Sequence, residues 1–378
     1  MDKERRLLFL DDLDDENRYK WLEYWSSHNH AAWRQHPACG EVARACGERP
    51  IYVIGFVNDD IQLVGVFNLR SIVSGLGTID AVCLRGPVFE DLSFANWCLP
   101  RIHEYFRLRK IGSIRIGPYW RFPEAVEVEQ SLFGMGYQRF EKEHALGRRT
   151  TGIVDLRGGE EELLKSFKQS TRYEINHARK LGVDLRIASS VGEAMEFFNH
   201  LDQRDKERGI GRTIRVEALA ISAFLTAKSE AGAIISAYQG DVFLGGLMVN
   251  RGGKTAFTVK FVVSKDCKRL LPTLRIAPTL FFSGMLWAKS RNCEFVDLEG
   301  YSQSDPNHGD KAFVNRYKAG FRPTECESLG QYSMVCNKSL YRIQQLLDFG
   351  GKLARLPHRI VHRVRFELKR RRVERAAH

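Results

Sequence analysis

Residues 294 to 321 decide how the chain is interpreted, because they place charged side chains directly after a predicted strand. The stretch reads Glu294-Phe-Val-Asp-Leu-Glu-Gly-Tyr301 and, after a polar loop, Phe313-Val-Asn-Arg-Tyr-Lys-Ala-Gly-Phe321. Its first part alternates apolar and polar residues, which predicts a strand, and the apolar run 280–292 before it predicts a helix. We therefore expect Asp297, Glu299 and Lys318 to meet at one strand end, where α/β domains carry their chemistry.

The composition indicates a soluble globular protein of two ordinary domains. The chain has 378 residues, of which 43% are hydrophobic and 28% charged. No stretch reaches the roughly 18 to 20 uncharged apolar residues of a membrane-spanning helix, and the N-terminal apolar run is too short for a signal peptide. The eight cysteines contain no Cys-x-x-Cys pair, which favours reduced, buried thiols. We expect a cytoplasmic protein without a metal site.

The net charge of +12 is concentrated at the C-terminus. From residue 351 onward ten Lys or Arg stand against two Glu, and apolar residues recur at spacings of three and four. This predicts a basic amphipathic helix in a tail of residues 341–378. Such a helix binds the inner face of an anionic membrane as a peripheral contact, follows a tRNA backbone, or docks its apolar stripe on the body of the protein. The sequence leaves these three alternatives open.

The predicted elements occur twice in the same order. Each half has a hairpin, a strand, a helix, a further strand and a closing strand with glycine and aromatic residues. The ranges are 51–70, 83–88, 93–109, 113–120 and 132–140 in the first half, and 232–250, 256–263, 274–289, 294–299 and 317–323 in the second. This duplication predicts an α/β (α+β) fold of two similar units. We place the first domain at 1–150 and the second, with the active site, at 151–340.

The segment 160–182 is predicted to be one helix that ends at a glycine C-cap. Its polar side is either a solvated surface or an anion site. The polar residues are Lys165, Lys168, Arg172, Asn176, Arg179 and Lys180.

The run Lys168-Gln-Ser-Thr-Arg-Tyr-Glu-Ile-Asn-His-Ala-Arg-Lys-Leu-Gly182-Val resembles the segment that opens the second domain of the FemXAB family. Three further stretches are similar to the same family: Trp33–Pro37, Arg85–Val88, and Trp287–Gly300 together with Tyr317–Phe321. FemXAB proteins are nonribosomal peptidyltransferases that transfer amino acids from aminoacyl-tRNA to peptidoglycan precursors, and they share the GNAT acyltransferase fold. The resemblance covers roughly residues 30 to 335 and does not extend to the tail.

The resemblance implies a tandem of two GNAT-like domains, each a mixed sheet flanked by helices. It also implies an aminoacyltransferase that acts on an amine of a cell-envelope precursor or a similar small, anionic acceptor. Lys318 would lie beside the reacting carbonyl, and the helix end with Arg204 and Arg208 would hold the acceptor. The full set of expected substrate-binding residues is Arg172, Tyr173, Asn176, Arg204, Arg208, Tyr301 and Tyr317. This sequence departs from the family pattern at two places: Tyr317 replaces the usual Phe, and Leu298-Glu299-Gly300 replaces the usual Gly-Gly. The family's acceptor therefore cannot be assigned to this protein by analogy.

The proposed chemistry needs a proton acceptor and a group that stabilises the oxyanion. Lys318 suits the oxyanion, and Asp297 or Glu299 suits the proton. Structural roles remain as alternatives: Asp297 as a loop cap, Glu299 as a surface carboxylate, and Lys318 as its ion-pair partner. The sequence shows no motif for a covalent nucleophile, so direct attack is expected.

The donor remains a choice between two molecules. Coenzyme A in GNAT acetyltransferases binds a glycine-rich turn at a helix N-terminus, but residues 268–274 contain no glycine, and Pro272 lacks an N–H. Lys265, Lys268 and Arg269 are candidates for binding donor phosphate or tRNA. We expect no permanently bound cofactor, with aminoacyl-tRNA as co-substrate and acyl-coenzyme A as the alternative. A further alternative is a non-catalytic RNA- or membrane-binding module. The oligomeric state stays open.

Overall fold

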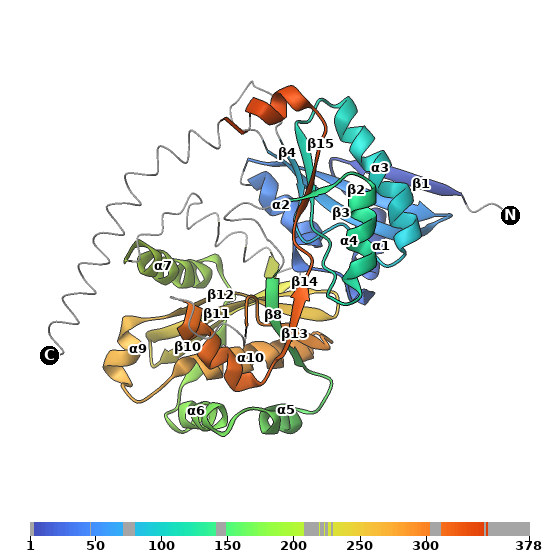
Figure 1. Cartoon of the computed structure of the whole chain (residues 1–378). Helices are drawn as coiled ribbons and strands as arrows, with labels where there is room; N and C mark the ends of the chain where they lie inside the picture. The colour runs from blue at the N-terminus through green and yellow to red at the C-terminus, as the bar shows by residue number, and fades with distance from the viewer. Residues whose placement is uncertain are drawn as a thin grey trace, which may run out of the picture.

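The computed structural model describes most of the chain. The described residues are 4–45, 47–70, 80–140, 149–207, 219, 223, 226–227, 230–302, 311–343 and 345–346. Their strands form two mixed sheets, one built mainly from each half of the chain (Figure 1). Arg208, Cys46 and nearly all of the predicted basic helix in the tail lie outside these residues.

The first sheet has the order β1-β2-β3-β4-β6-β15-β7, with β5 paired to β3. Its strands pair antiparallel except β4 and β6, which are parallel. The strands are β1 (Arg5–Leu10), β2 (Arg49–Val57), β3 (Asp60–Arg70), β4 (Asp80–Cys83), β5 (Val88–Phe89), β6 (Ser113–Ile116), β7 (Gln138–Arg139) and β15 (Tyr332–Val335). The helices of this half are α1 (Asp15–Ser27), η1 (Trp33–Gln35), α2 (Pro37–Ala45), α3 (Leu92–Leu108) and α4 (Ala125–Gly134).

The second sheet has the order β14-β8-β13-β12-β11-β10-β9, and only β12 and β13 are parallel. The strands are β8 (Arg149–Asp155), β9 (Asp184–Ile187), β10 (Gly232–Gln239), β11 (Val242–Gly252), β12 (Thr255–Val263), β13 (Phe295–Asp297) and β14 (Thr324–Ser328). The helices are α5 (Glu160–Ser166), α6 (Gln169–Lys180), α7 (Val191–Glu207), α9 (Lys265–Leu270), α10 (Ile276–Ser290), α11 (Lys311–Lys318) and η2 (Ala319–Phe321). Both sheets therefore share one plan, with a single parallel pair joined through a helix.

Each sheet has apolar side chains on both faces, as the long apolar strands predict. In β2, Ile51 and Val53 join the core under α3 and α4, whereas the alternating Tyr52 and Ile54 join the core under α1. This is the period of two expected of a strand. In the second sheet α10 covers one face and α7 covers the other. The predicted hairpins and the two connecting helices are thus confirmed.

The two halves exchange one strand each. In the first sheet β15 lies between β6 and β7, and in the second sheet β8 occupies the same place between β13 and β14. Along the chain β8 follows β7, and β15 follows β14. Figure 1 shows the red strand β15 among the strands of the first half and the green strand β8 among those of the second. The predicted second domain, 151–340, therefore includes one strand of the first sheet, because chain position does not determine hydrogen-bond partners.

The segment 160–182 was predicted to be one helix, but it is broken into α5 and α6 at Phe167. This residue has extended backbone angles, and its fully buried ring packs edge-on against Phe282 and Phe321, with centroids 5.9 and 5.1 Å away. Arg172 donates to the carbonyls of Lys165 and Phe167 at 3.0 and 2.7 Å. Burial of one aromatic ring thus prevails over a continuous helical pattern.

The predicted closing strand at 317–323 is also wrong. The residues end α11 and form η2, and the strand is β14, which begins at Thr324. The physical reason is that Tyr317 and Phe321 both contact Phe281, with ring centroids 5.4 and 5.8 Å away. Residues four apart lie on the same side of a strand as well, but there they are about 13 Å apart, whereas in a helix they are about 6 Å apart and can contact one ring.

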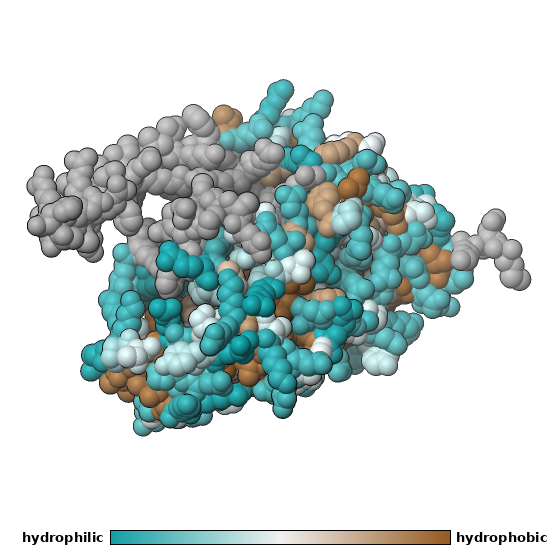
Figure 2. All heavy atoms as spheres, turned by 60° about the horizontal axis from the view of Figure 1, so that its bottom comes forward, coloured by the Kyte–Doolittle hydropathy of each residue, from teal (hydrophilic) through white to brown (hydrophobic). Residues whose placement is uncertain are grey.

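The surface and the cysteines agree with a globular protein. Figure 2 shows a largely hydrophilic face with apolar atoms in small separate patches. No helix within the described ranges has the length and apolar character needed to cross a membrane. All seven described cysteines are free thiols.

Candidate active site at the domain interface

A sharp turn follows β13, which lies between β8 and β12 inside the second sheet. β12 and β13 pair over only three positions, the last being Phe257 with Asp297. Glu299 and Gly300 then both adopt positive φ angles of 52° and 64°. A glutamate rarely adopts such a conformation, so its surroundings must hold it there. Part of that support is the Glu299 N–H, which donates to Asp297 at 2.7 Å. We call residues 297–301 the β13 turn.

Asp297 fixes this turn and joins the two domains. Its side chain is 1% exposed and accepts hydrogen bonds from the hydroxyls of Tyr119 and Thr151, the first at 2.8 Å, besides the Glu299 N–H. Tyr119 belongs to the segment after β6 in the first domain. Burial, and then the charge of Asp297, raise the pKa of the Tyr119 hydroxyl well above its usual value. Because its carboxylate is buried and accepts three hydrogen bonds, Asp297 holds the β13 turn against Tyr119 and Thr151.

The side chain of Glu299 is held by Arg85, which follows β4 in the first domain. One guanidinium nitrogen lies 3.2 and 3.3 Å from the two carboxylate oxygens. Arg85 is buried, whereas the Glu299 side chain keeps 20% of its surface exposed. Burial lowers the pKa of Arg85, but the charges of Glu299 and Asp297 outweigh burial and raise it. Of the two predicted carboxylates, only Glu299 is in contact with solvent to a useful degree.

Lys318 contacts the same turn from α11. Its ammonium group donates to the carbonyl oxygens of Glu299 and Gly300 at 2.5 and 3.2 Å, and the residue is 5% exposed. The structure therefore brings Asp297, Glu299 and Lys318 together at one strand end, as the sequence predicts. Their catalytic roles remain predictions.

Sequence reasoning missed the residues that complete this cluster. Arg85, Tyr119 and Thr151 come from three separate parts of the chain. The only available signal was the Arg85-Gly-Pro stretch that resembles the FemXAB family, and it did not indicate a partner.

Three predicted substrate-binding residues lie on α6 and have other surroundings. Arg172 caps the end of α5, as described above. Tyr173 is 63% exposed and stacks on His177 with centroids 5.6 Å apart. Asn176 is exposed on the same helix. This face of α6 thus shows the features of a solvated surface.

Three other predicted residues take part in packing. Arg204 donates to the carbonyl of Phe261 at 2.5 Å and pairs with its neighbour Asp205 at 2.8 Å. Tyr317 packs against Phe261, and burial raises the pKa of its hydroxyl. Tyr301 is 3% exposed, and its backbone N–H donates to Thr150 in β8 at 3.1 Å.

The predicted donor-binding residues lie on α9. Lys265 pairs with Glu207 at 2.5 Å, Arg269 pairs with Asp266 at 2.9 Å, and Lys268 is exposed. The first two cations are thus already neutralised by carboxylates.

A carboxylate also occupies the N-terminus of α10. Glu174 of α6 accepts the backbone N–H of Arg275 at 3.2 Å and lies 3.7 Å from its guanidinium. The third residue of the helix is Pro278, which has no N–H to offer. Because the positive end of this helix dipole already faces an anion, a second anion is disfavoured there.

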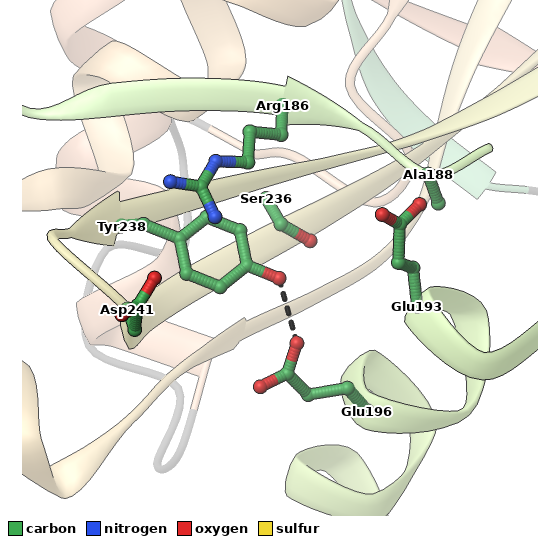
Figure 3. Close-up of a pocket in the computed structure, with 7 residues that line it drawn as sticks. All are labelled: Arg186, Ala188, Glu193, Glu196, Ser236, Tyr238 and Asp241. Atoms are coloured by element: carbon green, nitrogen blue, oxygen red, sulfur yellow. Dashed lines mark hydrogen bonds between the residues drawn. The ribbon is translucent and has the colours of Figure 1, made fainter. Parts of the chain in front are cut away.

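Two hollows lie beside α7, away from the β13 turn. The smaller, of about 230 Å³, is lined by Glu196 and Tyr238, among others, and the larger, of about 650 Å³, by residues of α7. Figure 3 shows the Tyr238 hydroxyl donating to Glu196, at 2.6 Å, and the Arg186 guanidinium over the Tyr238 ring. Neither hollow is lined by a residue that the sequence predicts to be catalytic. In the part of the chain that is described, no group of three or more His, Cys, Asp or Glu side chains could hold a metal ion.

Comparison with known proteins shows the fold. The crystal structure of FemX matches with a TM-score of 0.74 and 14% identity, covering 89% of this chain and 99% of that one. A tandem GNAT protein from the clavulanic acid biosynthesis pathway has a TM-score of 0.51 and 11% identity, with 88% and 99% covered. The C-terminal domain of a protein described as a lysylphosphatidylglycerol synthetase from Agrobacterium fabrum has a TM-score of 0.50 and 14% identity. The match covers 88% of this chain and 96% of that one.

No protein-family model matches the chain, and no curated protein matches it by sequence. The fold is therefore established by structure alone. The protein has the tandem GNAT fold of FemX, as its resemblance to the FemXAB family implied.

Proposed function

We propose that this protein is an acyltransferase that transfers an amino acid from aminoacyl-tRNA to an amine. The observation that carries the proposal is the buried ammonium group of Lys318, fixed at the β13 turn of a FemX-like fold. A fixed cation in a site with little water stabilises developing negative charge more strongly than the same cation in solution.

The reaction proceeds by direct attack. The amine nitrogen of the acceptor forms a bond to the ester carbonyl carbon of the aminoacyl-tRNA, and negative charge develops on the carbonyl oxygen near Lys318. The carbon–oxygen bond to the ribose then breaks, and the ribose oxygen takes up a proton. The attacking nitrogen loses its proton to Glu299, directly or through one water, while Asp297 holds the turn in place. No covalent enzyme intermediate is needed.

The choice of tRNA over coenzyme A rests on the helix N-termini. In the second domain Glu174 already occupies the start of α10. In the first domain Asp91 caps α3 by accepting the Ser93 N–H at 2.7 Å. A pyrophosphate at either helix would face a carboxylate. These contacts support a donor that binds elsewhere on the surface.

The proposal is tested by supplying charged tRNA and acyl-coenzyme A side by side, with a panel of amine acceptors. We expect turnover with charged tRNA. Turnover with acyl-coenzyme A alone would overturn the donor assignment. No turnover with either, together with RNA or vesicle binding, would favour a binding module.

The role of Lys318 is tested by Lys318→Met with a matched control. Loss of one charge-stabilising donor reduces kcat by about 100- to 1000-fold. Lys289 offers the control, because its ammonium also donates to two backbone carbonyls, those of Leu156 and Gly158, away from the β13 turn. Lys289→Met should lower stability but leave kcat nearly unchanged. Equal kcat for the two variants would contradict the role of Lys318.

A further inference from the structure

The last described part of the chain is a short helix on the first domain (Figure 1). Residues 338–343 and 345–346 are helical. Asn337 caps this helix, because its side-chain oxygen accepts two backbone N–H groups of the first turn at 3.0 and 3.2 Å. The Gly112 carbonyl accepts the N–H groups of Asn337 and of the residue before it, both at 3.0 Å. These bonds fix the start of the helix beside the segment that follows α3.

Aliphatic side chains are exposed on both of these segments. On the short helix Ile343 and Leu346 are 37% and 71% exposed, and because they are three residues apart they lie on one side of it. Leu108, the last residue of α3, is 66% exposed. It stands four residues before Gly112, so at most about 14 Å of chain separates it from the carbonyl that holds Asn337. We define the terminal face as Leu108, Lys110, Lys338, Arg342, Ile343 and Leu346.

The terminal face is positive as well as apolar. Lys110, Lys338 and Arg342 are exposed, and within the described ranges none of the three forms an ion pair. Residues 104–110 and 338–346 together contain five Lys or Arg and one Glu. That glutamate, Glu104, accepts two hydrogen bonds from Arg107, both at 2.6 Å, so its charge is already matched.

The chain continues from the terminal face into its most basic segment. Residues 351–378 contain ten Lys or Arg and two Glu, and only residues 347–350 separate them from Leu346. The positive charge of the tail is therefore attached to the chain at a surface that is itself positive. A partner that meets this surface meets both.

We propose that the terminal face docks on a lipid bilayer that contains anionic phospholipids. The three aliphatic side chains enter the boundary between headgroups and acyl chains, where each buried CH₂ group favours binding, and the three cations contact lipid phosphates. RNA fits this surface less well, because proteins bind unpaired bases by stacking them on aromatic side chains, whereas the exposed apolar side chains here are aliphatic. The inference concerns described residues outside the tail and does not depend on acyl transfer.

Docking is tested by sedimenting the full chain with vesicles of phosphatidylcholine that contain about one third phosphatidylglycerol. Leu108→Ser combined with Leu346→Ser removes two exposed aliphatic side chains and should weaken binding by about tenfold. The control is Ile187→Ser, because Ile187 is 54% exposed but lies on β9 in the second domain. It should bind like the unmodified protein.

Two outcomes of this measurement would overturn the proposal. If the unmodified protein does not sediment with the vesicles, the terminal face does not dock on anionic lipid. If the double variant binds as tightly as the unmodified protein, the tail or another surface makes the contact.

The position of the contact is tested by acetylating the lysines with and without these vesicles and measuring each site by mass spectrometry. The vesicles should slow the modification of Lys110 and Lys338 several-fold. Lys180, which is exposed at the end of α6 in the second domain, is the control in the same sample and should react at an unchanged rate. Equal protection of all three lysines, or protection by RNA and not by vesicles, would contradict docking of the terminal face on lipid.

Discussion

The two domains have the same strand order but differ at the ends of their parallel strands. In the first domain the backbone closes the end, because the Gly117 N–H donates to the Gly86 carbonyl at 2.8 Å. In the second domain the β12–β13 ladder ends at Phe257 and Asp297, and among the described residues the contact beyond it is the Thr258 hydroxyl, 3.5 Å from the carbonyl of Asp297. Besides its backbone hydrogen bonds to β8, the β13 turn is held by side chains, and two of these, Arg85 and Tyr119, come from the first domain. One copy of the fold supports the site that the other carries.

The largest expected effect comes from removing an ion pair between the domains, compared with removing an ion pair within one domain. Arg85→Ala breaks a largely buried ion pair with Glu299 and should reduce the free energy of unfolding by about 3 kcal/mol. Arg115→Ala is the matched change, because Arg115 forms a largely buried pair with Asp80 inside the first sheet. We expect a similar loss of stability in urea unfolding for both. Only Arg85→Ala should also reduce acyl transfer. Equal acyl-transfer activities of the two variants would contradict the claim that the first domain supports the site of the second.

A smaller effect concerns the buried tyrosines of the first domain. Tyr119→Phe removes a hydrogen bond to a charged carboxylate and should reduce the free energy of unfolding by about 2 kcal/mol. Tyr137 is also 1% exposed, but its hydroxyl has no hydrogen-bond partner among the described residues. Tyr137→Phe should thus be neutral or slightly stabilising in the same urea titration. If the two substitutions cost the same, Tyr119 does not anchor the second domain.

The smallest effect is a sensitivity to acid in the segment that precedes α2. Burial lowers the pKa of His36 to about 3, and its Nδ1 accepts the Ala38 N–H at 3.2 Å, so the folded protein holds it neutral. The unfolded chain binds a proton near the ordinary pKa of about 6.5. Stability is therefore complete above that pH and is lost as the pH falls from about 6.5 towards 3.

The loss from this one histidine should be about 1 kcal/mol between pH 6 and pH 5. The check is urea unfolding of the protein and of His36→Gln across this range. The substitution should make the dependence on pH shallower. An unchanged slope would show that His36 does not cause the sensitivity.

Local patterns predicted the repeated elements but not their long-range partners. The β2–β3 hairpin follows from alternation and a turn at Asn58, which are properties of neighbouring residues. By contrast, Arg85 and Glu299 are 214 positions apart, and Tyr119 and Asp297 are 178 apart. No periodicity links such residues, so the sequence gives the location of the carboxylates but not what holds them. The wrong prediction of a strand at 317–323 has a related cause. Its glycine and aromatic residues are compatible with a strand, and only the contact of both Tyr317 and Phe321 with Phe281 indicates a helix.

The strand exchange also sets an order for folding during synthesis. β6 ends at Ile116, but its neighbour β15 begins only at Tyr332, more than 200 residues later. At the usual rate of about 5 to 20 residues per second, the first sheet remains incomplete for at least ten seconds or so after β6 has left the ribosome. During this time β6 has one unpaired edge. A chain whose synthesis stops before β15 would thus lack a strand of its first sheet, although β6 has long been made.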